Sequence, residues 1–296
     1  MLPRARLPRL TRPTRLTALI IVAVFALGTA GGAIAGGAMS VPTFVPKMAD
    51  QVTNLDILRS QIKNYYGTPT AATGMTNCNK NLAPAADGNY AAEAASVAAD
   101  GGRWLSTGAR ANSNAMKAIV LDVDDTTLAT WNYELCSNWA FDPVTNGQFV
   151  TDQRFPAVPG MVAMANQAAA DGYAVFFLTG RGQAQEAATL GNLTHDGIGV
   201  DAGFPAPTTL TNGEDGLFTK PPVGSYPAYL DKPEFCAASI AANRSCPTIQ
   251  YKSGVRAHIE DLGYDIVANF GDQFSDLDGG FSDRTFKLPN PNYFLP

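Results

Sequence analysis

Short apolar runs recur along the second half of the chain, and each of them ends abruptly in polar residues. Runs that are apolar throughout are typical of strands buried on both faces of a parallel sheet. A stretch of helical period precedes the second run, over residues 160–170, and Gly172 is placed to close it. The pattern predicts an α/β fold in which helices cover both faces of a parallel sheet. The runs expected to form strands are residues 119–121, 174–178, 248–251, 266–270 and 285–288.

The residues before the first predicted strand follow a different pattern. Apolar side chains at helical spacing predict a helix over residues 49–66, which Gly67 ends. Residues 68–88 are rich in Thr, Asn, Gly and Pro and predict a loop, whereas residues 90–99 are Ala-rich and favour a helix. We therefore expect a linker and N-terminal helical region over residues 39–114, followed by a core domain over residues 115–296.

A basic and then apolar leader opens the chain. Five arginines in the first fifteen residues are followed by an apolar run over residues 16–25 and by small residues up to Ala38. This layout predicts a secretory signal peptide over residues 1–38. The alternative is an uncleaved anchor, because residues 16–39 are long enough to span a bilayer, although their Gly- and Ala-rich second half is weakly apolar. Either way we expect export, to the exterior or to the outer face of the membrane.

Net charge limits the partners of the exported part. The whole chain carries a formal charge of −5, and without the five leader arginines 16 basic residues face 26 acidic ones. Because nucleic-acid binding depends on basic side chains that neutralise phosphates, this acidic body argues against a nucleic-acid partner.

Four cysteines in an exported chain predict two disulfides. Cys236 and Cys246 enclose a short Ala-rich segment and are the favoured pair, which leaves Cys78 with Cys136. Four cysteines allow three pairings, so the others stay open. A zinc site is the alternative, but no CxxC spacing or adjacent His supports it.

Three carboxylates follow the first predicted strand, in the segment AIVLDVDDTTL. Strand alternation places Asp122 and Asp124 on the same side of the chain, with Asp125 beside them. Like charges crowd in this way where a cation or a reaction needs them. Mg²⁺ is the expected cation, because it prefers carboxylate, carbonyl and water oxygens. A polar turn is the alternative interpretation, since Asp and Thr also favour turns.

Polar residues also follow the other predicted strands. The strand at residues 248–251 is expected to lead into Lys252 and a helix that Ser253 caps and Gly263 ends. In open parallel sheets, ligands bind beyond the carboxyl ends of the strands, so one cleft could collect all of these side chains. They are Thr179, Gly180 and Arg181 after the second strand, Lys252 after the third, and Asp272 and Asp276 after the fourth.

Four short motifs stand in order along the chain: DVDDT, LTGR, YK and GDQFSD. Together they resemble the haloacid dehalogenase (HAD) superfamily of aspartate-nucleophile phosphatases. The segments YKSGVR, GDQFSDL and FKLPNPNYF are similar to secreted acid phosphatases of the class B/C type related to plant vegetative storage proteins, over about residues 90–294. The resemblance implies a three-layer α/β/α HAD-like (Rossmannoid) fold with a small lid insertion at about residues 129–158. It also implies an exported, Mg²⁺-dependent acid phosphatase that hydrolyses phosphomonoesters.

The resemblance assigns catalytic roles that also suit the residue types. Asp122 would attack phosphorus and form an aspartyl-phosphate. Asp124 would protonate the leaving oxygen and then deprotonate the attacking water. Thr179 and the Gly180 amide would hold a phosphoryl oxygen, while Lys252 offsets charge in the transition state.

The same resemblance places Mg²⁺ among the carboxylates. Asp122, the backbone carbonyl of Asp124 and Asp272 would bind the ion, and Asp276 would steer a metal-bound water or Lys252. Asp125 is expected to support this site from behind, and Arg181 to cap or pair.

The lid segment carries aromatic residues that are candidates for contact with substrate. Trp131 and Tyr133 could stack on a nucleobase or an aryl group of a small phosphomonoester. They could equally form the small core of the lid itself, together with Trp139 and Phe141.

Two other classes of protein share parts of this pattern. A catalytically idle storage or binding protein on the same fold is one alternative, but the presence of Asp122 favours an enzyme. A receiver domain also groups carboxylates around a phosphoacceptor, but the leader and the pair of Asp122 and Asp124 argue against it.

Overall fold

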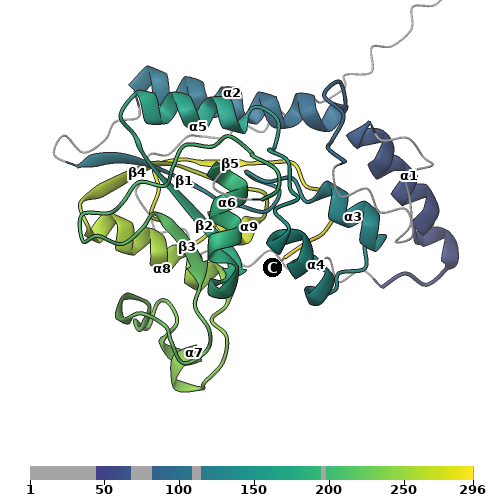
Figure 1. The fold of residues 1–296 in the computed structure, drawn as a ribbon. Coiled ribbons are helices and arrows are strands. Elements are labelled where there is room, and N and C mark those ends of the chain that lie inside the picture. Colours follow the sequence, from purple (N-terminus) through teal and green to yellow (C-terminus); the bar gives the residue numbers. More distant parts are fainter. Residues whose placement is uncertain (1–44, 68–81, 109–114, 195–197, 296) are drawn as a thin grey trace, which may run out of the picture. The chain divides into compact units, whose positions relative to one another are not determined.

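Five parallel strands form the centre of the computed structural model, in the order β3-β2-β1-β4-β5 (Figure 1). The structure describes residues 45–67, 82–108, 115–194 and 198–295, all within one unit over residues 36–296. The predicted leader and Cys78 lie outside the described residues. The strands are β1 (Met116–Leu121), β2 (Ala174–Gly182), β3 (Leu217–Lys220), β4 (Tyr264–Gly271) and β5 (Thr285–Lys287).

Helices cover both faces of this sheet, which confirms the predicted three-layer α/β/α fold (Figure 1). The longer ones are α1 (Leu55–Tyr66), α2 (Asn89–Gly108), α4 (Pro143–Thr151), α5 (Met161–Ala170), α6 (Glu186–Thr194) and α8 (Thr248–Asp261). The shorter ones are α3 (Trp131–Ser137), α7 (Ala237–Ala241) and α9 (Phe274–Leu277), with 3₁₀ turns at Ala49–Gln51, Gln183–Gln185 and Ala228–Leu230.

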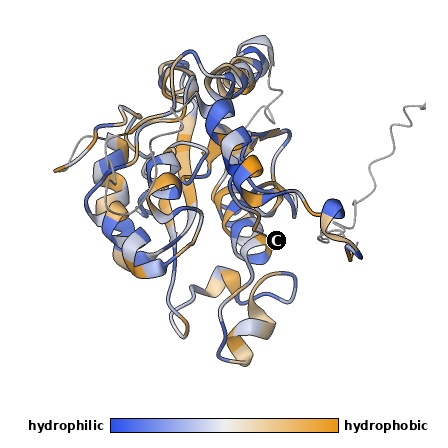
Figure 2. Cartoon of the chain, turned by 90° about the vertical axis from the view of Figure 1, so that its right-hand side faces the viewer, coloured by the Kyte–Doolittle hydropathy of each residue, from blue (hydrophilic) through white to orange (hydrophobic). Residues whose placement is uncertain are grey.

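Alternation along β1 divides the interior into two cores. Ile119 and Leu121 face the core beneath α2 and α5, whereas Ala118 and Val120 face the core beneath α8. All four side chains are buried, so the strand is apolar throughout, as the sequence indicates. Figure 2 shows the same concentration of hydrophobic residues on the strands between the helices.

Most of the predicted helices are present, with shifted ends. The first, α1, begins at Leu55 because the Asn54 side chain accepts hydrogen bonds from the Asp56 and Ile57 amides. It ends at Gly67, whose φ of 73° is left-handed, as predicted. The helix predicted over residues 90–99 extends further, to Gly108.

The strand predicted over residues 248–251 is wrong, because these residues form the first turn of α8. Tyr251, Val255 and Ile259 recur at helical spacing and all pack into the core beneath α8. Ser253 therefore lies inside the helix, where its hydroxyl donates to the Ile249 carbonyl at 2.7 Å, and does not cap it. The strand in this part of the sheet is β3, a four-residue run that the sequence pattern did not reveal.

Helices α3 and α4 lie on the segment between β1 and α5, where the lid is expected. The chain leaves and returns at one place, because the Ala129 amide donates to the Pro156 carbonyl at 2.7 Å and the Val158 amide donates to the Thr127 carbonyl at 2.8 Å. These bonds fix both ends of the segment beside the carboxyl end of β1.

The predicted pairing of Cys236 with Cys246 is confirmed. Cys136 is also disulfide-bonded, but Cys78 is outside the described residues, so the pairing of these two stays a prediction. Among the residues that the structure describes, no helix combines the length and apolar character needed to cross a membrane.

Replacing both Cys236 and Cys246 with Ala should lower the free energy of unfolding by about 2–3 kcal/mol, because the bridge closes a short loop. Denaturant unfolding of wild type and variant, with and without reductant, measures the difference. Reductant should narrow the gap between the two proteins. Equal stability of both proteins without reductant would contradict a stabilising role for the bridge.

Candidate active site

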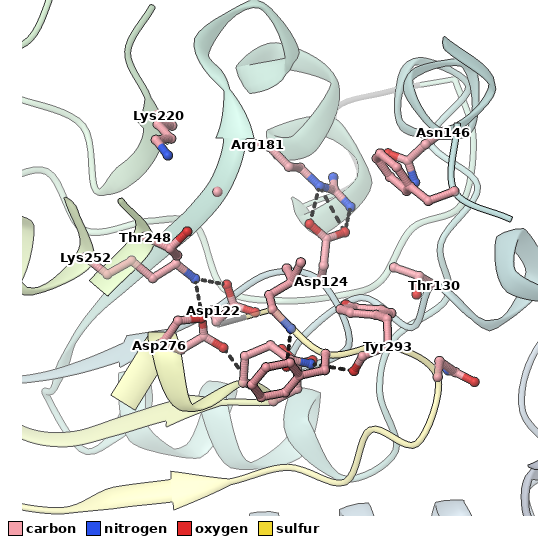
Figure 3. A pocket seen from close by; sticks show the side chains of 18 of the residues that line it. Asp122, Asp124, Thr130, Asn146, Arg181, Lys220, Thr248, Lys252, Asp276 and Tyr293 are labelled. Atoms are coloured by element: carbon pink, nitrogen blue, oxygen red, sulfur yellow. Dashed lines mark hydrogen bonds and ion pairs between the residues drawn. The ribbon is translucent and has the colours of Figure 1, made fainter. Parts of the chain in front are cut away.

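The carboxyl ends of β1, β2 and β4 border a cavity of about 560 Å³ (Figure 3). The sheet order reverses beside β1, and such a switch point is where open α/β sheets bind ligands. Seven of the residues that the sequence places beyond strand ends line this cavity together: Asp122, Asp124, Gly180, Arg181, Lys252, Asp272 and Asp276.

A buried lysine lies between two buried carboxylates at the floor of the cavity. The Lys252 ammonium contacts the Asp122 carboxylate and lies 2.7 Å from Asp276 Oδ1 (Figure 3). Burial would lower the pKa of Lys252, but the charges of Asp122 and Asp276 outweigh it and raise that pKa above its usual range. Lys252 reaches this place from the first turns of α8, not from the end of a strand.

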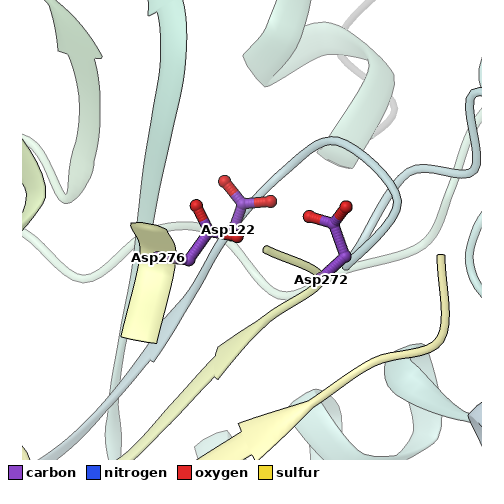
Figure 4. A group of neighbouring side chains, drawn as sticks. All are labelled: Asp122, Asp272 and Asp276. Atoms are coloured by element: carbon purple, nitrogen blue, oxygen red, sulfur yellow. The ribbon is translucent and has the colours of Figure 1, made fainter. Parts of the chain in front are cut away.

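Three carboxylates are close enough to share one cation. Asp122, Asp272 and Asp276 each offer an oxygen, and these oxygens lie within 4.8 Å of one another (Figure 4). Hard carboxylate oxygens suit a divalent cation such as Mg²⁺. The Asp272 carboxylate is further fixed by the side-chain amides of Gln273 at 2.7 Å and Asn290 at 2.6 Å.

Crowding of these carboxylates changes their proton affinity. Burial raises the pKa of Asp122 to about 7, the neighbouring Asp276 adds to the shift, and Lys252 opposes it. Burial, with Asp276 and Asp122, likewise raises the pKa of Asp272 well above its usual range. The protein alone therefore favours protons on Asp122 and Asp272, and a bound cation would favour their ionised forms.

Asp124 is directed toward Arg181 and not toward Asp122 (Figure 3). Arg181 Nη2 donates to Asp124 Oδ1 at 2.7 Å and Nε donates to Oδ2 at 3.1 Å, while Nη1 donates to the Thr189 hydroxyl at 3.1 Å. Arg181 thus forms the pairing expected of it. The Asp124 carboxylate lies outside the group of three oxygens.

Thr179 and Gly180 differ in their access to the cavity. Gly180 lines it, and a Cβ added there would meet no atom within 4 Å. Thr179 is fully buried, is not part of the lining, and its hydroxyl accepts a hydrogen bond from the Arg181 amide at 3.1 Å. The hydroxyl predicted to hold a phosphoryl oxygen therefore supports the backbone at the carboxyl end of β2.

Trp131 and Tyr133 do not line the cavity, which corrects their predicted place at the substrate. Trp131 is fully buried and stacks on Tyr66 with ring centroids 3.9 Å apart. The buried Tyr133 accepts a hydrogen bond from the Asp142 amide at 2.8 Å. Trp131 thus packs against α1 and Tyr133 packs within the lid segment, whereas Trp139 and Phe141 are the aromatic residues of this segment that border the cavity.

Several lining residues were not predicted from the sequence. Lys220 ends β3, so it was missed together with that strand. Tyr293 belongs to the segment FKLPNPNYF, which supported the resemblance but was given no place in the site, and no motif marks Glu134 on α3. Asp125 has φ of 53° and is buried behind the cavity, where its carboxylate accepts hydrogen bonds from the Thr130 amide and hydroxyl.

Comparison with known families agrees with this arrangement of a parallel sheet and carboxylates. The HAD superfamily, subfamily IIIB (acid phosphatase), matches residues 70–222 and 236–296. The chain therefore belongs to this subfamily of the HAD superfamily, as its motifs predicted.

Individual relatives are plant proteins. Acid phosphatase 1 of Solanum lycopersicum is 28% identical over 181 residues, which cover 60% of this chain and 58% of the relative. The stem 28 kDa glycoprotein of Glycine max is 28% identical over 182 residues, or 60% of this chain and 59% of the relative. The chain thus matches somewhat under two thirds of the length of these relatives.

A solved structure shares the fold. The class C acid phosphatase from Bacillus anthracis superposes with a TM-score of 0.51 at 17% identity, over 81% of this chain and 87% of that chain. At this level of identity the likeness shows the HAD-like fold alone.

The metal-free protein should lose stability as pH rises. A carboxyl whose pKa is raised in the folded state stabilises the fold most below its unfolded value of 3.8, and this contribution is lost as pH rises through about 7. The Asp122→Asn variant has no ionisable group at this position. Its free energy of unfolding should therefore fall less between pH 4 and pH 7.5 than that of wild type, by about a few kcal/mol.

Denaturant unfolding in chelator at both pH values measures this loss for the two proteins. Added Mg²⁺ should reduce the loss in wild type by favouring the ionised carboxylates. The raised pKa of Asp122 would be contradicted if, in chelator, wild type were more stable at pH 7.5 than at pH 4 and Asp122→Asn gained the same amount.

Proposed function

We propose that this protein is an exported, Mg²⁺-dependent acid phosphatase that hydrolyses phosphomonoesters through an aspartyl-phosphate. The observation that carries the proposal is the Asp122 carboxylate, which faces the cavity in contact with Lys252 and shares a potential cation site with Asp272 and Asp276. Membership of the acid phosphatase subfamily supports the same reaction class.

Asp122 is the proposed nucleophile. Its carboxylate oxygen forms a bond to phosphorus while the bond between phosphorus and the ester oxygen breaks, and the alcohol departs. Lys252 offsets the negative charge of Asp122 and Asp276 and stabilises phosphoryl oxygens that gather charge in the transition state. A bound Mg²⁺ would neutralise phosphate charge and orient the phosphoryl group against Asp122.

Asp124 is the proposed proton carrier. It gives a proton to the departing oxygen and then takes one from the water that cleaves the aspartyl-phosphate. Its pairing with Arg181 holds the carboxylate at the wall of the cavity, so transfer requires a turn of the side chain toward Asp122. The buried Asp125 and Thr130 hold the backbone of this turn.

A storage or binding protein is the weaker candidate. Vegetative storage protein 2 of Arabidopsis thaliana is 50% identical, but over only 48 residues, or 16% of this chain. The full set of Asp122, Asp124, Lys252, Asp272 and Asp276 argues for turnover, because an idle protein has no need to bury these charges together.

Export is proposed from the leader and from the disulfide. Disulfides persist in oxidising compartments, and the bridge between Cys236 and Cys246 supports secretion of a processed chain. The plant relatives described as glycoproteins agree with this compartment.

The two aspartates should fail differently. Asp122→Asn removes the nucleophile and should abolish turnover of every substrate. Asp124→Asn should lower steady-state turnover by about 10²–10⁴-fold, because it removes a general acid and base. Nitrophenolate departs without protonation, so Asp124→Asn should release one equivalent of nitrophenol in a burst and then stall with phosphate on the protein.

Rapid-quench measurements on nitrophenyl phosphate test this difference, after calorimetry has shown that each variant binds Mg²⁺. Wild type in chelator serves as the control and should be inactive until Mg²⁺ is restored. A burst from Asp122→Asn, but none from Asp124→Asn, would reverse the two roles.

A further inference from the structure

Glu134 is a buried carboxyl that the proposed reaction does not use. It lies on α3 of the lid segment, only 7% of its surface is exposed, and it lines the cavity that holds Asp122. Within the described part of the chain, no hydrogen bond or ion pair engages its carboxyl. Its partner is therefore expected in the cavity.

The Glu134 carboxyl is not among the fully enclosed polar atoms that lack a partner, so its oxygens meet the cavity, where a ligand can reach them. Glu is almost never buried without a partner, because burial removes the hydrogen bonds that water would supply. Burial, followed by the charges of Asp125 and Asp124, raises the pKa of Glu134 to about 8. Below that pH the group is a neutral acid that can both donate and accept a hydrogen bond.

The surroundings of Glu134 present apolar surfaces as well. Trp139 and Phe141 line the same cavity, and Trp139 is held by a hydrogen bond from its indole nitrogen to Asn292 Oδ1 at 3.2 Å. Aromatic faces suit the C–H surfaces of an aliphatic or cyclic alcohol, whereas a polar group on that alcohol needs a partner such as Glu134.

A cationic group is a poor match for this wall. The Arg59 guanidinium and the Lys63 ammonium already lie 6.0 and 5.9 Å from the Trp139 ring centroid. A further positive charge would be repelled by both, whereas a neutral hydroxyl would not.

We propose that Glu134 determines specificity by exchanging hydrogen bonds with a hydroxyl on the alcohol portion of the substrate, so that the enzyme prefers polyol and sugar monophosphates. This inference rests on the proposed phosphatase function and adds its substrate class. When a substrate without the hydroxyl binds, Glu134 loses contact with water and gains no hydrogen bond in return, so that substrate binds more weakly.

Matched substrate pairs test the proposal. Glucose 6-phosphate is compared with cyclohexylmethyl phosphate, and glycerol 1-phosphate with propyl phosphate, so that each pair differs in hydroxyl groups. Wild type should prefer the hydroxylated member of at least one pair by about tenfold or more in kcat/KM. The ratio within a pair is the readout, because it is independent of the overall rate.

Variants separate hydrogen bonding from charge. Glu134→Gln donates and accepts as the neutral acid does, so it should keep most of the preference. Glu134→Leu has similar size without polar atoms and should reduce the ratio to about one. Val144→Ala is the matched lid control, because Val144 is 68% exposed on α4 and does not line the cavity, and it should leave the ratio unchanged.

Three results would overturn the proposal. One is a kcat/KM ratio within each pair that is the same in wild type and Glu134→Leu. This includes the case in which the variant is slower by the same factor on both members of a pair. Another is a loss of the ratio in Glu134→Gln as large as in Glu134→Leu. The third is a preference for phosphoethanolamine over ethyl phosphate that depends on Glu134, since this would assign a cation to the site.

Failure of the phosphatase proposal can be distinguished from failure of the proposed role of Glu134. If wild type with Mg²⁺ turns over no phosphomonoester, including nitrophenyl phosphate, the phosphatase proposal fails. The hydroxyl contact can still be tested by calorimetry. Affinities for the same substrate pairs are measured in the Asp122→Asn protein with and without the additional Glu134→Leu substitution. Equal affinities within every pair would then refute the role of Glu134 as well.

Discussion

Electrostatic repulsion among buried carboxylates is the constraint on which the rest of this structure depends. Asp122, Asp272 and Asp276 place their oxygens within one small volume at the ends of β1 and β4. Lys252 compensates part of their charge from α8, and a cation would compensate more. The surrounding fold can be understood as the means of holding these groups together while leaving one side open to a substrate.

Close packing at the strand ends makes this cluster possible. Gly271 ends β4, and a Cβ at this position would lie 2.4 Å from the Asp276 Cβ, so any larger residue would displace the carboxylate. Arg256 on α8 supports the same turn by donating to the Asp276 carbonyl at 2.7 Å. Two elements that are distant in sequence from β1 thus fix the position of Asp276 beside Asp122.

The sequence was sufficient to predict site residues where a polar residue of suitable chemistry directly follows a clearly apolar run. Asp122, Asp272 and Gly180 follow strands whose apolar character is clear, so their meeting at one edge of the sheet could be predicted. Lys252 was placed in the site for the wrong reason, because the β-branched start of α8 resembles a strand and Pro247 before it was not interpreted as a helix start.

Other parts of the site depend on tertiary packing that no local pattern contains. Trp131 and Tyr133 carry aromatic rings that suit a substrate, but contacts with Tyr66 and Asp142 bury them. Glu134 directly follows Tyr133 on the same short helix, and it borders the cavity. All seven residues of this helix are buried, so only the rotation of each position about the helix axis decides which side chain meets the cavity and which meets the core.

Trapping of the covalent intermediate tests the central claim, that Asp122 is the residue that receives the phosphoryl group. Borohydride reduces an aspartyl-phosphate to homoserine, so enzyme quenched during turnover with Mg²⁺ and then reduced can be mapped by peptide mass spectrometry. We predict homoserine in place of Asp122 and unchanged aspartate at Asp124, Asp125, Asp272 and Asp276. Conversion at any of those four residues, or no conversion in enzyme that is turning over substrate, would contradict it.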